Sequence, residues 1–198
     1  LGQDASAIRR DVLKRGARSA NNVAAAAPYF RTLRAFGGVT TEDIDLLCPF
    51  VDSSYTENVN AAVALVKPPL DRKAQKALVC CNVHSNWAAA TLFPTDGAEV
   101  FEAAKDGDPS ALEAALQARA GGTIRAKNGE TLLNWLVSSG RADLVRIALQ
   151  SKPDVNELGL KGKTPLMTAA ERYSNDTEII EMLLAAGADR SETDCSGK

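Results

Sequence analysis

The sequence has few of the residues on which catalysis usually depends. Its 198 residues include one histidine, the side chain that most acid–base mechanisms use to move a proton. Its two glycine pairs, Gly37-Gly38 and Gly121-Gly122, are not followed by the lysine–serine pair of a phosphate-binding loop. We therefore predict no catalytic residue, no cofactor and no small-molecule substrate.

The sequence also lacks long apolar runs, and it has little net charge and few aromatic residues. No run approaches the roughly 20 apolar residues that a membrane-spanning helix needs. The net charge of -2 gives no electrostatic reason to expect nucleic acid as a partner. Aromatic residues make up 5% of the chain and alanine is abundant, which favours closely packed helices over a sheet. We predict an all-α protein, whose length allows one or two domains.

The four cysteines do not have the spacing of a disulfide framework, so we predict reduced thiols in an intracellular protein. Cys80, Cys81 and His84 form the cluster worth weighing, because residues 80 and 84 lie one helical turn apart. A zinc site needs four ligands, and Cys48 and Cys195 each lack a nearby partner in the sequence. A Cys–His nucleophile would need a cleft and oxyanion donors that a surface helix does not offer. We therefore predict no metal site and no nucleophile here.

Residues 162–189 form the best-defined segment of the chain. Thr164 suits the cap of a helix and Pro165 its first position, where a missing N–H group costs nothing. After a polar loop, a second apolar stripe ends at Gly187, a residue suited to a left-handed helix end. Each predicted helix is too short to be stable alone in water, so the segment must stack on a similar one.

The chain contains similar segments at a regular spacing. Gly97, Gly129, Gly162 and Gly197 are 32, 33 and 35 residues apart. Equivalent positions carry the same residues in the pairs Thr131 and Thr164, Leu133 and Leu166, Leu149 and Leu184, and Ala103-Ala104 and Ala169-Ala170. A fixed period of this length predicts a solenoid of stacked units.

These residues resemble the ankyrin repeat, whose pattern is G-x-TPLH-x-AA, a turn glycine, a second helix and LL-x-x-GAD. TPL, AA, LL and GAD all occur in register in the third unit. The second unit has Leu132 in place of proline and Asn134 in place of histidine, the first lacks TPLH, and the third has extra residues around Ser174-Asn175. The resemblance implies an ankyrin-repeat α-solenoid over residues 95–198. Its units would be 95–126, 127–159 and 160–193, with the start of a fourth at 194–198.

Residues 1–36 differ from the rest because arginine and lysine far outnumber acidic residues there. We predict a basic N-terminal helical arm that leans on the repeats or on a partner, with a weak helical run that ends at Pro28. An organelle presequence is an alternative, since it has the same Arg-rich, acid-poor character. The run from Gly2 to Ser6 also fits the N-myristoylation spacing, although leucine and not methionine precedes it. Membrane contact is therefore predicted only through this arm. The predicted location is the cytoplasm, including cytoskeletal or ciliary assemblies, with a mitochondrion or another organelle as the alternative.

Residues 37–94 predict short helices without a repeat motif. Thr40 or Thr41 caps the first, Pro68-Pro69 ends the second, Asp71 caps the third, and a fourth runs from about Ser85 to Leu92. We interpret this region as an irregular helical lead-in, or capping region, that is continuous with the stack, with a separate small helical domain as the alternative.

The resemblance implies a non-catalytic protein–protein interaction module or scaffold subunit, acting as part of a larger assembly. Ankyrin stacks bind partners through their hairpin tips and the exposed side of their first helices. Carried over by position, the predicted tip residues are Lys127, Asn128, Glu130, Leu160, Lys161 and Lys163. The predicted helix-face residues are Lys105, Asp106, Ser138, Ser139, Glu171 and Arg172. The tips are mainly basic, with Arg125 and Lys198 beside them, so we predict a partner with a partly acidic surface.

Two other functions fit the sequence less well. The repeats could be the targeting domain of a longer enzyme whose catalytic part lies outside this chain. The lead-in could instead carry an enzyme built on Cys80, Cys81 and His84.

Of the two tryptophans, Trp135 is predicted to pack between neighbouring repeats, and Trp87 to fill the joint between the lead-in and the stack.

Overall fold

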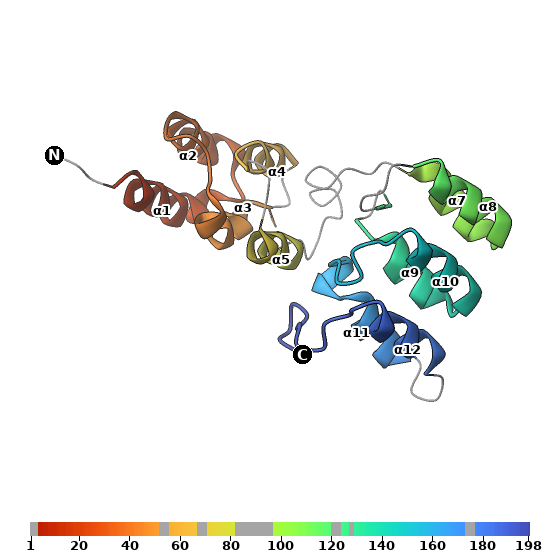
Figure 1. The fold of residues 1–198 in the computed structure, drawn as a ribbon. Coiled ribbons are helices and arrows are strands. Elements are labelled where there is room, and N and C mark those ends of the chain that lie inside the picture. Colours follow the sequence, from red (N-terminus) through yellow and green to blue (C-terminus); the bar gives the residue numbers. More distant parts are fainter. Residues whose placement is uncertain are drawn as a thin grey trace. The chain divides into compact units, whose positions relative to one another are not determined.

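The computed structural model describes residues 4–51, 56–66, 71–81, 97–119, 124–126, 129–172 and 177–198. It divides into two compact units, Leu1–Leu92 and Phe93–Lys198, which are described separately below (Figure 1). Within the described residues the regular structure is helical, apart from two isolated bridges, Val39 with Val66 and Arg125 with Thr131. The all-α prediction is confirmed.

The first unit contains five α-helices and two 3₁₀ turns among its described residues. In chain order they are α1 (Ala5–Gly16), η1 (Ala17–Ser19), α2 (Val23–Ala35), η2 (Thr41–Leu47), α3 (Cys48–Val51), α4 (Thr56–Val63) and α5 (Arg72–Cys81). Their buried faces share one apolar core, in which Leu13, Leu33, Leu47 and Phe50 are fully buried. Residues 1–36 and the described part of 37–92 therefore belong to one compact unit.

The prediction that the helical run ends at Pro28 is wrong. Helix α2 begins after the Asn22 side chain, which accepts a hydrogen bond from Ala25 N, and continues through Pro28 to Ala35. Proline removes one backbone hydrogen bond from the helix interior. Phe30 lies next to the helix centre and Leu33 about one turn after it. Their burial holds the helix together despite the loss, and Phe30 packs edge-on against Phe50.

Two of the predicted basic-arm arginines meet the acidic lead-in at Asp43. This carboxylate is buried, and it lies 3.5 Å from both Arg9 Nε and Arg10 Nε. The sequence predicts Thr40 or Thr41 as the cap of η2. In the structure the Thr40 hydroxyl does not cap this helix and donates instead to Asp43 Oδ2. Asp71 caps α5 as predicted, by accepting a hydrogen bond from Ala74 N.

The described residues of the second unit form three helical hairpins and a C-terminal turn. The hairpins are α7 (Ala98–Asp106) with α8 (Pro109–Gln117), α9 (Leu132–Ser139) with α10 (Ala142–Gln150), and α11 (Pro165–Arg172) with α12 (Glu178–Ala185). A short 3₁₀ turn, η3 (Leu160–Gly162), precedes α11. Helix α9 packs on α11, and α10 packs between α8 and α12, so that first helices and second helices form separate layers (Figure 1).

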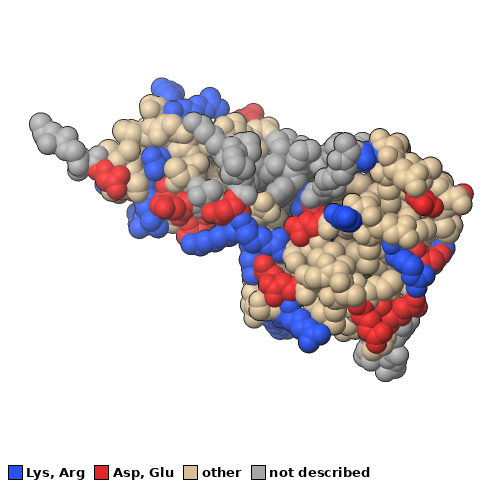
Figure 2. Space-filling view, in the orientation of Figure 1, with Lys and Arg blue, Asp and Glu red and all other residues tan. Residues whose placement is uncertain are grey.

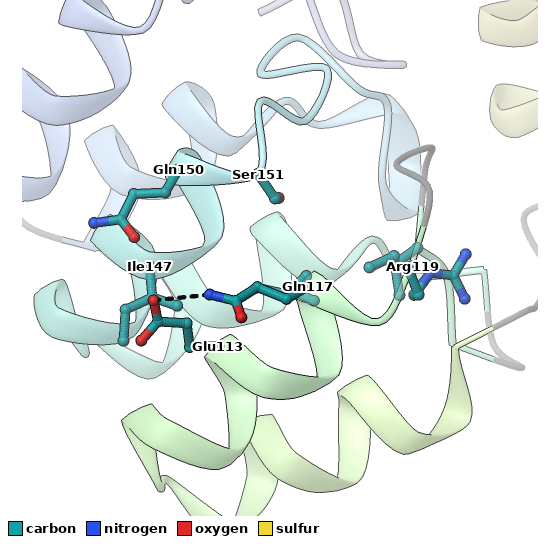
Figure 3. Close-up of a pocket in the computed structure, with 8 residues that line it drawn as sticks. Glu113, Gln117, Arg119, Ile147, Gln150 and Ser151 are labelled. Atoms are coloured by element: carbon teal, nitrogen blue, oxygen red, sulfur yellow. Dashed lines mark hydrogen bonds between the residues drawn. The ribbon is translucent and has the colours of Figure 1, made fainter.

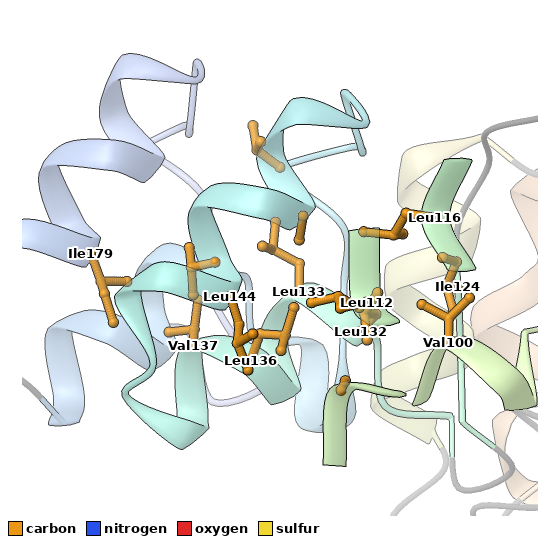
Figure 4. Close-up of a cluster of buried hydrophobic side chains, with 14 of the residues drawn as sticks. Val100, Leu112, Leu116, Ile124, Leu132, Leu133, Leu136, Val137, Leu144 and Ile179 are labelled. Carbon is orange, nitrogen blue, oxygen red and sulfur yellow. The ribbon is translucent and has the colours of Figure 1, made fainter. Parts of the chain in front are cut away.

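One apolar core runs through all three hairpins. Figure 4 shows it passing from Val100 and Leu112 in the first hairpin, through Leu136 and Leu144 in the second, to Ile179 in the third. Trp135 of α9 meets Phe101 of α7 edge-on, with ring centroids 6.3 Å apart, which confirms the predicted packing between repeats. The predicted helix at 85–92, which includes Trp87, lies outside the described residues, and so does His84.

The periodic glycines occupy backbone conformations that other residues rarely adopt. Gly97, Gly129, Gly162 and Gly197 all have positive φ, between 68° and 115°. Gly129 and Gly162 lie three residues before the first helix of their hairpins, Gly97 lies directly before α7, and Gly197 lies in the C-terminal turn. A glycine can take such a φ without the steric penalty of a β-carbon. The 32-to-35-residue period in the sequence is therefore the period of these positive-φ glycines.

The prediction of reduced thiols is wrong for the cysteines that the structure describes. Cys48, Cys80 and Cys195 are disulfide-bonded. Spacing in the sequence could not reveal this, because a disulfide depends on the distance between residues in the folded chain.

Candidate protein-binding site

The predicted binding residues lie on the tips and first helices of the second unit. Each tip is a short hairpin, closed in the third repeat by Gly159 N donating to Lys163 O. The tip of the second repeat is closed by Ala126 N donating to Glu130 O and Leu132 N donating to Ile124 O. Proline has no N–H group and could not make the second bond. This explains why leucine is suited to position 132 in this chain.

Asn134 links the second repeat to the third. Its Nδ2 donates to Lys163 O at 3.1 Å, and its Oδ1 accepts from the Thr168 hydroxyl at 2.9 Å. Asn134 is buried, and its own backbone N–H is capped by the Thr131 hydroxyl. Where the repeat pattern has histidine, asparagine thus supplies one donor and one acceptor across the repeat boundary.

The sequence predicts Arg125 at the margin of the binding surface, but in the structure Arg125 is buried. Its Nη1 donates to Gly129 O and to Leu158 O, both at 2.9 Å. Its Nη2 lies 3.2 Å from Glu157 Oε1, and both side chains are less than a tenth exposed. A buried guanidinium with these partners ties the second tip to the third, and a partner cannot reach it.

Glu130 is half-buried, and its carboxylate is used within the stack. Oε1 accepts hydrogen bonds from Thr131 N and from Leu160 N of the next tip. Burial raises the pKa of Glu130, although these backbone bonds and Arg125 act in the opposite direction. Gly159 passes so close that a β-carbon there would collide with Glu130 Oε1 and Asn134 Nδ2. The tips of the second and third repeats are therefore in close contact at this point.

The helix-face residues fall into two groups. Lys105, Asp106, Ser139, Glu171 and Arg172 are exposed, while Ser138 is half-buried. Lys105 pairs with Glu102 along its own helix, and the Ser139 hydroxyl donates to Leu136 O. Arg172 instead reaches the neighbouring repeat, where its Nη1 donates to Ser138 O at 2.9 Å. The C-terminal ends of α9 and α11 are thus joined, and the exposed side chains form one surface.

The third tip carries the remaining predicted contacts. Lys163 Nζ lies 2.5 Å from Glu171 Oε2, so its charge is largely compensated. Lys161 is exposed, and its carbonyl accepts from Cys195 N of the following turn. Leu160 is half-buried. Lys127 and Asn128 of the second tip lie outside the described residues. Figure 2 shows acidic and basic residues interspersed over the surface.

The residues after α12 form a turn that stacks on the third tip. Asp194 is its centre: Oδ1 accepts from Ser196 N, the Ser196 hydroxyl and Lys198 N. These bonds, led by the one from Ser196, lower the pKa of Asp194 to about 2. The turn repeats the tip geometry of the earlier units, with Gly197 at φ 79°.

A pocket that the sequence did not indicate lies on the other layer, between α8 and α10. It has a volume of about 290 Å³ and is lined by Glu113, Leu116, Gln117, Arg119, Ile124, Ile147, Gln150 and Ser151. Figure 3 shows Gln117 pointing toward Glu113, to which its Nε2 donates at 3.1 Å. The lining residues come from second helices and from a segment between repeats, and the repeat pattern assigns no binding role to either.

Among the described residues, no group of three or more His, Cys, Asp or Glu side chains could hold a metal ion. His84 of the predicted Cys80–Cys81–His84 cluster lies outside these residues. No described helix is both long and apolar enough to cross a bilayer.

Comparison with known proteins identifies the repeating part of the chain. Residues 100–194 match a family model described as ankyrin repeats (3 copies). A protein of Oryza sativa subsp. japonica named "Probable E3 ubiquitin-protein ligase XBOS31" is 38% identical over 96 residues. The match covers 48% of this chain and 21% of the rice protein, so this chain spans about a fifth of the length of that relative.

The first prediction concerns the bond between the second and third repeats. Asn134→Ala leaves Lys163 O and the Thr168 hydroxyl without their partner, and should reduce the free energy of unfolding by about 1–3 kcal/mol. Urea unfolding followed by circular dichroism measures this. Ser139→Ala, which removes the bond of an exposed side chain within α9 itself, is the control and should change it by less than about 0.5 kcal/mol. A loss no larger for Asn134→Ala than for the control would show that Asn134 does not join the repeats.

The second prediction concerns the pH dependence of the C-terminal turn. Because the pKa of Asp194 is lowered on folding, the ionised form stabilises the turn above about pH 4, and this contribution is lost as the pH falls through about 2. Ser196→Ala should raise the pKa toward the ordinary value of 3.8. Carboxylate NMR titration measures both values. An Asp194 pKa near 3.8 in the wild-type chain would contradict this account of the turn.

Proposed function

Residues 100–194 are an ankyrin repeat domain, and we propose that this domain binds a protein partner through its tips and first helices and catalyses no reaction. The exposed residues of this surface belong to α7, α9, α11 and the third tip, which the stack holds in fixed register. A solenoid of this kind offers an extended concave surface for binding. The observation that carries the proposal is the joining of neighbouring repeats beneath this surface, through Asn134 and Arg172.

The chemistry of the surface favours a folded or extended protein segment over a small ligand. Its side chains are charged or hydroxylic, spread over three repeats, and partly compensated by one another. Such a surface gains specificity from the pattern of charges more than from apolar burial. We propose that the partner presents carboxylates to the third tip, and that the repeats serve as a scaffold subunit in a larger assembly.

The proposal predicts that changes on the first-helix surface weaken binding and that equal changes on the second helices do not. Lys105→Glu with Ser139→Glu should reduce affinity for a captured partner about tenfold or more, since both side chains are exposed on α7 and α9 and the new carboxylates repel an acidic partner. Arg146→Glu with Gln117→Glu makes similar changes at exposed positions of α10 and α8. It should reduce affinity less than about twofold, an effect in the range of energetically neutral positions.

The partner for this test is obtained by affinity purification with the full chain from its native source. Binding is then measured with the purified partner by titration calorimetry, and circular dichroism checks that each variant is folded. If the second-helix variant lost affinity and the first-helix variant kept it, the binding surface would be on the pocket side of the stack, and the proposal would be wrong.

A second candidate function follows from the rice relative. We propose as the alternative that the repeats are the targeting part of a longer protein, because the rice relative is named as a probable ubiquitin ligase. Under this proposal, the first-helix surface would select the protein to be modified, and catalysis would lie outside this chain. The full reading frame decides between the two: a catalytic domain beyond these residues supports targeting, and its absence supports a scaffold subunit.

We propose an organelle with an oxidising interior over the cytoplasm that the sequence predicts, and membrane contact only through the basic residues of α1 and α2. The disulfide bonds of Cys48, Cys80 and Cys195 remove the argument from reduced thiols, because such bonds persist mainly in oxidising compartments. Imaging of the full-length tagged protein distinguishes these locations.

A further inference from the structure

We propose that Lys161 determines which partner the third tip accepts, by selecting a protein segment rich in carboxylates, and that the chain keeps this lysine at a cost in stability. This inference rests on the proposed function, since it names a specificity residue on the proposed binding surface. It is carried by the residue type at the tip, by its backbone conformation, and by the charges around it.

The residue type at this position is unusual for the chain. The residue before each tip glycine is Asp96, Asn128, Lys161 and Ser196 in turn. Three of the four are short polar residues, which suit tight turns because their side chains bond to nearby backbone. Lysine has no such advantage. Nothing in the folding of the tip therefore calls for lysine at position 161.

The backbone makes this choice costly. Lys161 has φ 59° and ψ 22°, which is the left-handed region, and Gly162 follows with φ 68°. Lys163 N donates to Leu160 O, so that Lys161 and Gly162 are the two central residues of a tight hairpin turn. Two successive left-handed residues strongly favour Asn-Gly, the pair that the second repeat has at 128–129. The left-handed conformation has a steric cost that is larger for lysine than for asparagine.

The charge of Lys161 is exposed and uncompensated by its neighbours on the tip. Lys163, two residues on, is paired with Glu171, whereas the structure gives the Lys161 ammonium no ion pair among the described residues. Backbone bonds hold the turn on both sides, because Lys161 O accepts from Cys195 N of the next turn. That next turn ends in another exposed lysine, Lys198. An exposed cation on a backbone that is held in place, next to a turn that carries a second exposed lysine, is complementary to an acidic protein segment.

Lys152 provides a matched control within the same repeats. It is the other described residue that is not glycine and has positive φ, at 53°, and it too is an exposed lysine. It lies just after α10, away from the tips. Lys152→Asn and Lys161→Asn therefore remove the same charge and relieve the same kind of backbone strain, at two places that differ in their relation to the proposed binding surface.

The experiment compares these two variants of the full chain in stability and in binding. Both should raise the melting temperature by about 1–4 °C, because asparagine adopts the left-handed conformation more easily. The binding probe is a fluorescein-labelled oligo-glutamate peptide, with oligo-glutamine as the neutral reference, measured by anisotropy at several salt concentrations. Lys161→Asn should weaken binding of oligo-glutamate about threefold or more and reduce its salt dependence. Lys152→Asn should leave both unchanged, and Lys161→Arg should keep the binding.

Four results would overturn the proposal. Lys161→Asn could bind oligo-glutamate as tightly as the wild type, or Lys152→Asn could weaken binding equally, which would show an effect of net charge alone. Lys161→Asn could lower the melting temperature, which would remove the stability cost. The wild type could also bind oligo-glutamine as well as oligo-glutamate. None of these results affects the first-helix variants tested with the captured partner, so failure here is distinguishable from failure of the proposed function.

Discussion

The second unit depends on contacts between neighbouring repeats. Its helices are eight or nine residues long, and helices of this length are marginal in water. They are held by an apolar core that passes from one hairpin to the next, and by polar groups that reach across each boundary. Asn134 is the clearest example, because it bonds both the backbone and a side chain of the following repeat. Without such contacts no single repeat has enough buried surface to fold.

The same contacts determine which side chains remain for a partner. Glu130, Arg172 and Lys163 all lie on the predicted binding surface, yet the first two bond to a neighbouring repeat and Lys163 is paired with Glu171 of its own repeat. The surface that is left consists of exposed residues near the C-terminal ends of the first helices and of the third tip. Stability and recognition therefore draw on one set of positions, and they compete most directly at Lys161, where a left-handed turn carries a lysine.

Local signals explain what the sequence could predict. The tip glycines, the Thr131 and Thr164 caps and the apolar periodicity depend on residues within one turn or one helix, and all appear in the structure as expected. The burial of Arg125 was not predictable in this way, because its partners Leu158 and Glu157 come from the next tip. Pro28 inside α2 and the disulfide-bonded cysteines likewise depend on packing between distant segments. The pocket between α8 and α10 arises from the spacing of two helices, which no residue pattern encodes.

Native-state hydrogen exchange tests the central claim, that the repeats hold one another and thereby fix the binding surface. The account predicts that the slowest amides of α9 and α11 exchange through the same opening, with equal free energies and equal dependence on denaturant. Asn134→Ala should lower both together. If the amides of α11 exchanged through a separate, lower-energy opening that Asn134→Ala left unchanged, the third repeat would fold independently of the second, and the account would be wrong.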